Sequence, residues 1–168
     1  MLIYPKDLPS RFPLKSGGPD GEHAAFLRAF GPFLMERYRP KALVVFSAHW
    51  ETTGQIEITD YRDNHLLYDY YGFPKPMYDV TWKSHGSSEI ASRVESLLGQ
   101  NNIRSKRLKE GGRGIDHGVF VPFMLMFPDQ PFPIPVTEVS IPSSLDPKEL
   151  LALGKALEPL RYAAGPTL

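Results

Sequence analysis

A short unbroken apolar run over residues 42–46 is the feature that most constrains the fold. The run, Ala-Leu-Val-Val-Phe, follows a helix-like segment over residues 22–38, and Pro40 separates the two. A continuous apolar run rich in β-branched residues is typical of a strand that is covered on both faces. Such strands occur in sheets flanked by helices, so the run predicts an α/β domain.

The segments around this strand continue the alternation. The helical spacing over residues 22–38 predicts a helix that Asp20 caps and whose core stripe is Phe26, Phe30, Phe33 and Arg37, with Leu27 and Leu34 beside it. Further strands are expected over residues 55–60, 103–108 and 135–141, and further helices over residues 89–98, capped by Ser88, and 118–128. Asp146, Pro147 and Glu149 begin a last helix, which ends near Arg161.

This order predicts one α/β domain, with a central, mostly parallel sheet flanked by helices. Residues 1–15 are proline-rich and are expected to be poorly ordered, which assigns the domain to residues 16–168. Only seven residues, 162–168, follow the last helix, whereas a crossover helix normally leads to another strand. We therefore expect the sheet to lack its carboxy-terminal part.

Charge and residue usage exclude several classes of function. The chain has 19 basic residues (Lys and Arg) and 19 acidic residues (Asp and Glu), so its formal net charge is zero. This balance does not favour binding to nucleic acid or anionic lipid. The chain has no cysteine, which leaves His, Asp and Glu as metal ligands. Residues 119–127, the longest apolar run, are too short to cross a bilayer, and the amino terminus lacks a signal peptide. A soluble, cytoplasmic protein is expected.

Two histidines are candidates for chemistry. His49, in Ser47-Ala48-His49-Trp50, is expected at the carboxyl end of the first strand, where ligands bind in open α/β sheets. His117, in Gly114-Ile115-Asp116-His117-Gly118, has a carboxylate beside it that could orient its ring. The alternatives are a histidine that hydrogen-bonds a loop and a glycine-rich turn before an Asp-capped helix.

An aromatic loop over residues 68–78 contains Phe73 and Tyr78 and could wall a pocket for a flat ring. Contact with a partner subunit is the alternative reading of this loop. The remaining histidines, His23, His65 and His85, are assigned to structure or solvent.

Taken together, these motifs resemble the class III extradiol ring-cleavage dioxygenases of the DODA type, the family of the 4,5-DOPA dioxygenases. The resemblance rests on Ser47-Ala48-His49-Trp50, on Tyr71-Gly72-Phe73-Pro74 with Tyr78, and on Asp116-His117-Gly118 with Pro122. It extends to Ser16-Gly17-Gly18-Pro19 and to the strand that ends at Ile141, so it covers residues 12–161.

The resemblance implies that a catechol ring is opened with O2 at a non-haem iron(II) or zinc. It makes His49 a metal ligand and His117 the catalytic histidine near substrate or oxygen. Ser16, Trp50, Phe73, Tyr78 and Asp116 then belong to the substrate pocket. A small aromatic diol and O2 are the implied partners, while the sequence leaves the oligomeric state open.

Two features of the sequence differ from the family's pattern and bear on activity. Ser16 stands where the family has a metal-binding histidine before Gly-Gly-Pro, and the family's carboxy-terminal ligands have no counterpart here. We therefore expect the 168-residue chain by itself to be inactive. A family remnant that serves as a binding or interaction protein is the alternative, and a zinc-dependent hydrolase is a third reading.

Overall fold

The structure is a computed structural model that describes residues 18 and 20–161. Ser16 and the segment 1–15 lie outside the described residues. The elements follow one another as α1 (Glu22–Tyr38), β1 (Leu43–Thr52), β2 (Ile56–Thr59), β3 (Asp63–Asn64), β4 (Leu66–Leu67), the 3-10 helix η2 (Lys75–Met77), β5 (Ser84–His85), α2 (Ser88–Gln100), β6 (Ser105–Leu108), β7 (Ile115–Asp116), α3 (His117–Met126), β8 (Val136–Pro142), α4 (Pro147–Ala156) and the 3-10 helix η3 (Glu158–Arg161).

The main sheet has four strands in the order β1-β8-β2-β6. Strand β1 runs parallel to β8, with Leu43 opposite Val136, and β2 runs parallel to β6. Strands β2 and β8 are antiparallel, with Ile58 opposite Val139. The sheet is therefore mixed but mostly parallel, and helices flank it, which confirms the predicted fold class. Two-stranded pairings of β3 with β5 and of β4 with β7 complete the framework.

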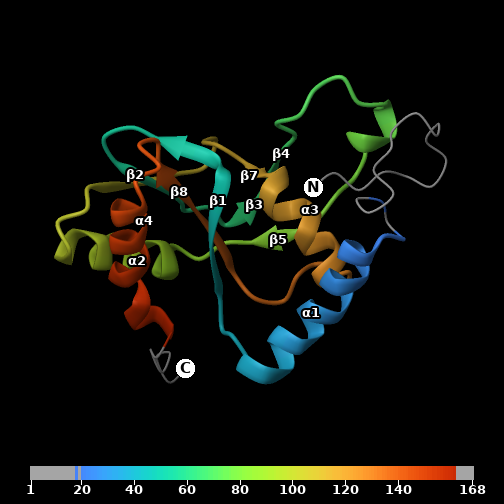
Figure 1. Ribbon diagram of the computed structural model, residues 1–168, viewed down its shortest axis with the longest axis horizontal. Coiled ribbons are helices and arrows are strands. Elements are labelled where there is room, and N and C mark those ends of the chain that lie inside the picture. The colour runs from blue at the N-terminus through green and yellow to red at the C-terminus, as the bar shows by residue number, and fades with distance from the viewer. Residues whose placement is uncertain (1–17, 19, 162–168) are drawn as a thin grey trace.

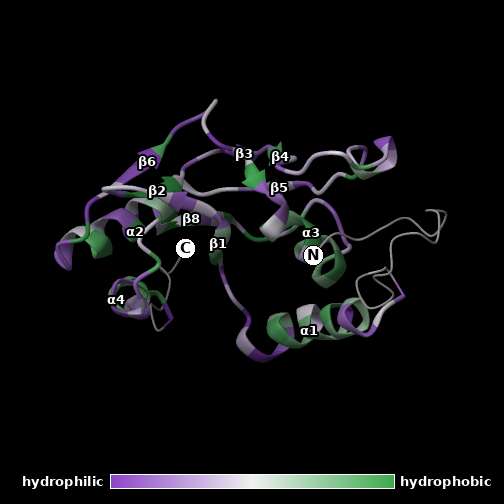
Figure 2. Cartoon of the chain, turned by 45° about the horizontal axis from the view of Figure 1, so that its top comes forward, coloured by the Kyte–Doolittle hydropathy of each residue, from purple (hydrophilic) through white to green (hydrophobic). Residues whose placement is uncertain are grey.

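Helices lie on both faces of the sheet (Figure 1). On one face, α2 and α4 pack on β2 and β8 through a core that includes Ile58, Val94 and Val139. On the other face, α1 packs on α3 over a core that includes Trp82 and Phe120. Figure 2 shows α3 as largely apolar, as expected for a helix that belongs to this second core. None of the helices among the described residues is long and apolar enough to span a membrane.

The helix signals in the sequence act as expected in the second half of the chain. Asp146 accepts a hydrogen bond from the Lys148 amide and Pro147 occupies the first turn of α4. Asp116 likewise accepts from the Gly118 amide and begins α3. The cap of α2 is Ser87 rather than Ser88, because the Ser87 side chain accepts from the Ile90 amide.

Helix α1 has the predicted bounds, but the predicted core stripe is right only in part: Leu27 is buried and Phe30 and Leu34 pack on the core, whereas Phe26 and Phe33 are exposed. Phe26 and Phe33 are 56% and 51% exposed, and the buried residues of α1 are Ala24, Leu27 and Gly31. Gly31 explains this rotation, because a Cβ at this position would lie 1.9 Å from the carbonyl oxygen of Met126 on α3. The helices approach closely along a face of small residues, which turns the phenylalanines outward. The residue at the N-cap position is Gly21, not Asp20.

Strand β1 is longer than the predicted run and continues to Thr52. His49 therefore lies within the strand rather than after it. The strand is also not fully covered, since Phe46 is 38% exposed. Its second half carries Ser47, His49 and Trp50 toward the start of α3, which is where the candidate site forms.

Candidate functional site

His49 and His117 lie side by side although 67 intervening positions separate them in the sequence. Their ring centroids are 4.1 Å apart, with the rings tilted by 57°. His49 comes from β1 and is exposed, whereas His117 is the first residue of α3 and is only 7% exposed. The two candidate histidines thus share one location, open to solvent on the His49 side.

Asp69 joins the two rings. Its Oδ1 lies 2.5 Å from Nδ1 of His117 and also accepts from the His117 amide at 3.2 Å. Its Oδ2 lies 3.9 Å from Nδ1 of His49. A carboxylate at Nδ1 favours the tautomer with the proton on that nitrogen, which leaves Nε2 of His117 as the basic atom. We call these three residues the histidine cluster.

The histidine cluster has the composition of a metal site. One donor atom from each of its residues lies within 4.8 Å of the other two. Two imidazoles and a carboxylate are a donor set typical of non-haem iron, and zinc accepts the same ligands. The residues present therefore fit a divalent metal ion.

The aromatic loop packs against His117 through Tyr70. The Tyr70 ring meets the His117 ring edge to face at 5.3 Å, and Tyr78 stacks on Tyr70 at 5.1 Å. Phe73 also contacts Tyr70 by its edge, at 5.7 Å. Burial raises the pKa of Tyr70 to about 12, and its hydroxyl donates to the Met77 carbonyl. Phe73 and Tyr78 thus pack on Tyr70, which in turn contacts His117.

Asp116 directly precedes His117, caps α3 and is 0% exposed. Its Oδ1 accepts from the Ser47 hydroxyl at 2.8 Å and from the Gly118 amide at 2.9 Å, and its Oδ2 accepts from Arg113 at 3.1 Å. Burial opposes the charge of Asp116, yet hydrogen bonds from its neighbours and the charge of Arg113 hold its pKa below the ordinary value. The carboxylate that orients His117 is thus Asp69, while Asp116 supports the site through these contacts.

Arg113 and Gly118 shape the surroundings of His49. The Arg113 guanidinium donates to the His49 carbonyl and lies 5.4 Å from the ring centre of Trp50, which is buried. A Cβ on Gly118 would lie 2.7 Å from Cδ2 of His49, so a side chain there would displace the imidazole. Glycine at this position permits the close approach of the ring to α3.

Sequence reasoning missed three residues of this network: Asp69, Arg113 and Glu138, whose Oε2 accepts from the Asp116 amide at 3.2 Å. Asp69 lies within the aromatic loop, where a carboxylate between two tyrosines was the available signal. Glu138 lies in the strand predicted over residues 135–141, where a charged residue among apolar ones marks a buried polar contact. Arg113 precedes the motif around His117, and nothing in the sequence singles it out.

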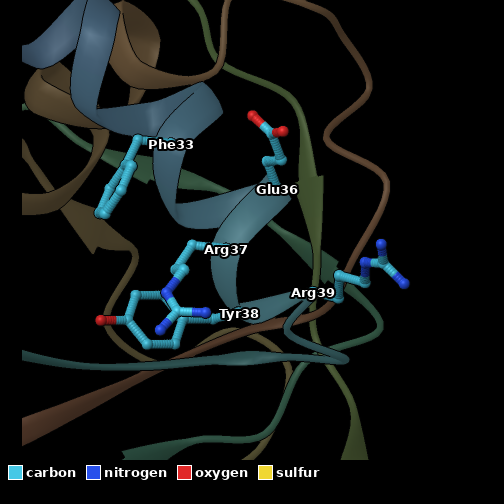
Figure 3. Close-up of a pocket in the computed structure, with 5 residues that line it drawn as sticks. All are labelled: Phe33, Glu36, Arg37, Tyr38 and Arg39. Carbon is cyan, nitrogen blue, oxygen red and sulfur yellow. The ribbon is translucent and has the colours of Figure 1, made fainter.

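A separate hollow lies at the carboxyl end of α1 (Figure 3). Its lining comes from one stretch of chain: Phe33, Glu36, Arg37, Tyr38 and Arg39. None of these residues contributes to the histidine cluster, and they offer a single carboxylate. We therefore place the candidate site at the cluster and not at this hollow.

Comparisons with known proteins show what the chain is similar to. Residues 11–165 match the family described as the catalytic LigB subunit of aromatic ring-opening dioxygenase. The chain is 49% identical over 142 residues to the 4,5-DOPA dioxygenase extradiol-like protein of Schizosaccharomyces pombe, covering 84% of this chain and 47% of that protein. It is 40% identical over 124 residues to the 4,5-DOPA dioxygenase extradiol of Beta vulgaris, covering 73% of this chain and 44% of that protein.

A solved structure is also similar. It is that of an uncharacterized protein from Escherichia coli K12, with a TM-score of 0.62 and 30% sequence identity. The match covers 82% of this chain and 48% of that one. The chain thus spans about half the length of the relatives it matches.

Proposed function

The chain belongs to the class III extradiol dioxygenases of the DODA type, in the family of the LigB catalytic subunit, and we propose that it serves the ring opening of a catechol-type substrate by O2 at a non-haem metal. Iron(II) is the catalytic metal we propose, with zinc as the alternative occupant. The observation that carries the proposal is the convergence of His49, Asp69 and His117 in one cluster.

His49 and Asp69 are the residues we assign to the metal. Nδ1 of His49 and Oδ2 of Asp69 are 3.9 Å apart, and metal bonds to such atoms are about 2.0–2.2 Å long, so one ion can contact both. The exposure of His49 leaves room for further ligands on the solvent side. When bound, the metal supplies a centre where a catecholate and oxygen can meet.

His117 is the residue we assign to proton handling. Asp69 holds Nδ1 of its ring, so Nε2 is the atom that can accept a proton from a catechol hydroxyl. Tyr70 fixes the other edge of the ring, and the aromatic loop limits the access of water on that side. These contacts keep one nitrogen of a buried imidazole directed at the substrate position.

Ser16 favours a second candidate function. A hydroxyl at the position of a metal-binding histidine is a weaker ligand, so the chain could retain metal and catechol binding without turnover. The same cluster would then serve a binding protein. This candidate shares the ligands of the first but not the ring-opening step.

One experiment separates the two candidates. The purified 168-residue chain is loaded with iron(II) without oxygen, titrated with catechol and then exposed to O2, and product is followed by absorbance and mass spectrometry. Ring-opened product that disappears in His117→Ala supports the dioxygenase and overturns the expectation that this chain is inactive by itself. Catechol binding without product supports the binding protein and contradicts turnover by this chain, while no binding of metal or catechol contradicts both.

A further inference from the structure

Glu138 is a buried acid that the proposed chemistry does not use. It lies on β8, in the middle of the sheet, and is 0% exposed. Its Oε2 accepts a hydrogen bond from the backbone amide of Asp116 at 3.2 Å. Its Oε1 is buried, and among the described residues it has no hydrogen-bond partner. A carboxyl group in such surroundings costs stability, so its presence calls for a compensating role.

The contact partner of Glu138 is the residue that supports the histidine cluster. Asp116 is also 0% exposed, and Ser47, Gly118 and Arg113 all donate to its carboxylate. These donors favour the charged form of Asp116. Two adjacent buried carboxyls cannot both be charged without a large penalty, so the proton resides on Glu138. Consistent with this, burial and then the contact with Asp116 raise the pKa of Glu138 to about 10.

Asp116 reaches the backbone on both sides of the cluster. It caps α3, whose first residue is His117. It also binds the Ser47 hydroxyl, which accepts from the His49 amide at 3.1 Å. Arg113 provides a second route, since the same Nη2 atom donates to Asp116 and to the His49 carbonyl. A shift of Asp116 would therefore change the distance between the two imidazoles.

We propose that Glu138 is a positioning residue: through its hydrogen bond to the Asp116 amide it fixes Asp116, and through Asp116 it sets the spacing of the His49 and His117 rings. The inference rests on the proposed function, because it treats the cluster as a metal site. Glu138 itself touches neither imidazole in the contacts of the described residues, so its effect is indirect. Removing an orienting partner of a metal ligand typically costs about 10–100-fold in metal affinity.

The test uses the 168-residue chain, Zn2+ as the probe and two readouts: Zn2+ affinity by calorimetry, and the imidazole resonances of His49 and His117 by NMR without metal. We expect Glu138→Leu to weaken Zn2+ binding by about 10–100-fold and to shift both sets of resonances. Glu138→Gln keeps an acceptor for the Asp116 amide and should stay within about threefold of the wild type. Thr137→Val, a change on the same strand at a residue 1% exposed, should leave both readouts unchanged.

Glu138→Asp provides a second test in case the Glu138→Leu variant does not fold. It shortens the side chain by one methylene and should break the contact to the Asp116 amide, so the same losses are expected in smaller measure. Wild-type affinity and unshifted imidazole resonances in a folded Leu or Asp variant would overturn the inference while the proposed function stands. A wild-type chain without Zn2+ binding would contradict the proposed function, and the resonances would still decide the role of Glu138.

Discussion

Asp60, which directly follows β2, and Glu138, on the neighbouring strand β8, are both buried acids, yet the protein stabilises them in opposite charge states. Burial opposes the charge of Asp60, but Lys109, Ser88 and Arg107 hold its pKa below the ordinary value. Lys109 contacts Oδ2 of Asp60 at 2.6 Å and Arg107 contacts it at 3.1 Å. Glu138 instead faces Asp116, whose cation, Arg113, is already engaged, and so it stays protonated.

The difference shows how location sets the role of an acid. Around Asp60, long cationic side chains reach in from β6 and from the segment after it while their ends remain partly in solvent, which stabilises a charge locally. Around Glu138, an uncharged carboxyl completes a network that supports the histidine cluster. We therefore expect changes at Asp60 to affect stability and changes near Glu138 to affect the site.

The largest expected effect is on metal binding at the cluster. His49→Ala should lower Zn2+ affinity by at least about 100-fold, since it removes a ligand rather than an orienting partner. The free energy of unfolding should change little, because the His49 side chain is 44% exposed. His23→Ala, at an exposed position on α1, is the matched control. Equal Zn2+ affinities of the wild type and His49→Ala in calorimetry would show that His49 is not a metal ligand.

The same chemical change at the two acids should give different stabilities. Asp60→Asn replaces a charge held by two cations and should cost about 2 kcal/mol of unfolding free energy at pH 7. Glu138→Gln replaces an acid that is neutral in the folded protein but ionises on unfolding at pH 7, so it should raise the unfolding free energy rather than lower it. Urea unfolding of both variants measures this, and similar losses would end the contrast.

The charge of Asp60 can also be tested by lowering the pH. The pKa of Asp60 in the folded protein lies below the ordinary value of 3.8. The charge of Asp60 therefore stabilises the protein above pH 3.8, and this stabilisation is lost as the pH falls through the folded pKa. The difference in unfolding free energy between the wild type and Asp60→Asn should therefore become smaller below about pH 4. A difference that is constant down to pH 2 would indicate that the charge of Asp60 contributes nothing.

Gly118→Ala should have an intermediate effect confined to the site. The added Cβ meets Cδ2 of His49 at 2.7 Å, and because this ring is partly exposed it can move away. We expect about a tenfold loss of Zn2+ affinity with little change in unfolding free energy. Gly154→Ala on α4, where an added Cβ meets nothing within 4 Å, is the control and should stabilise its helix slightly. Unchanged Zn2+ binding in Gly118→Ala would mean that the ring position is not critical.

The last effect is a pH dependence of the unfolding free energy that belongs to Glu138. Its folded pKa, raised from 4.5 to about 10, means that its contribution to stability is complete below pH 4.5 and is lost as the pH rises toward 10. The pKa of Asp116, the carboxylate that faces Glu138, is held below its ordinary value, so Asp116 stays charged across this range. Wild-type stability should therefore fall relative to Glu138→Gln across this range, and parallel curves in urea unfolding would refute the assignment.

The sequence predicted the fold better than it predicted the site. The alternation of segments identified the helices and main strands because periodicity and capping are local signals, as Asp146 at α4 shows. The face of α1 was predicted only in part because Gly31, a residue with no hydrophobic signal, determines how that helix meets α3. The roles of Asp69 and Glu138 were not predicted, because they depend on contacts with residues 48 and 22 positions away along the chain. Family resemblance singled out His49 and His117, which local patterns alone could not separate from structural histidines.

The most direct test of the central claim is a crystal structure of the chain with Zn2+ bound, with the ion located by anomalous scattering. We expect one ion about 2.0–2.2 Å from a nitrogen of His49 and an oxygen of Asp69, with the His117 ring beside it. An ion that binds elsewhere, for example at His23 or His65, with none on His49 at saturating Zn2+, would contradict the claim.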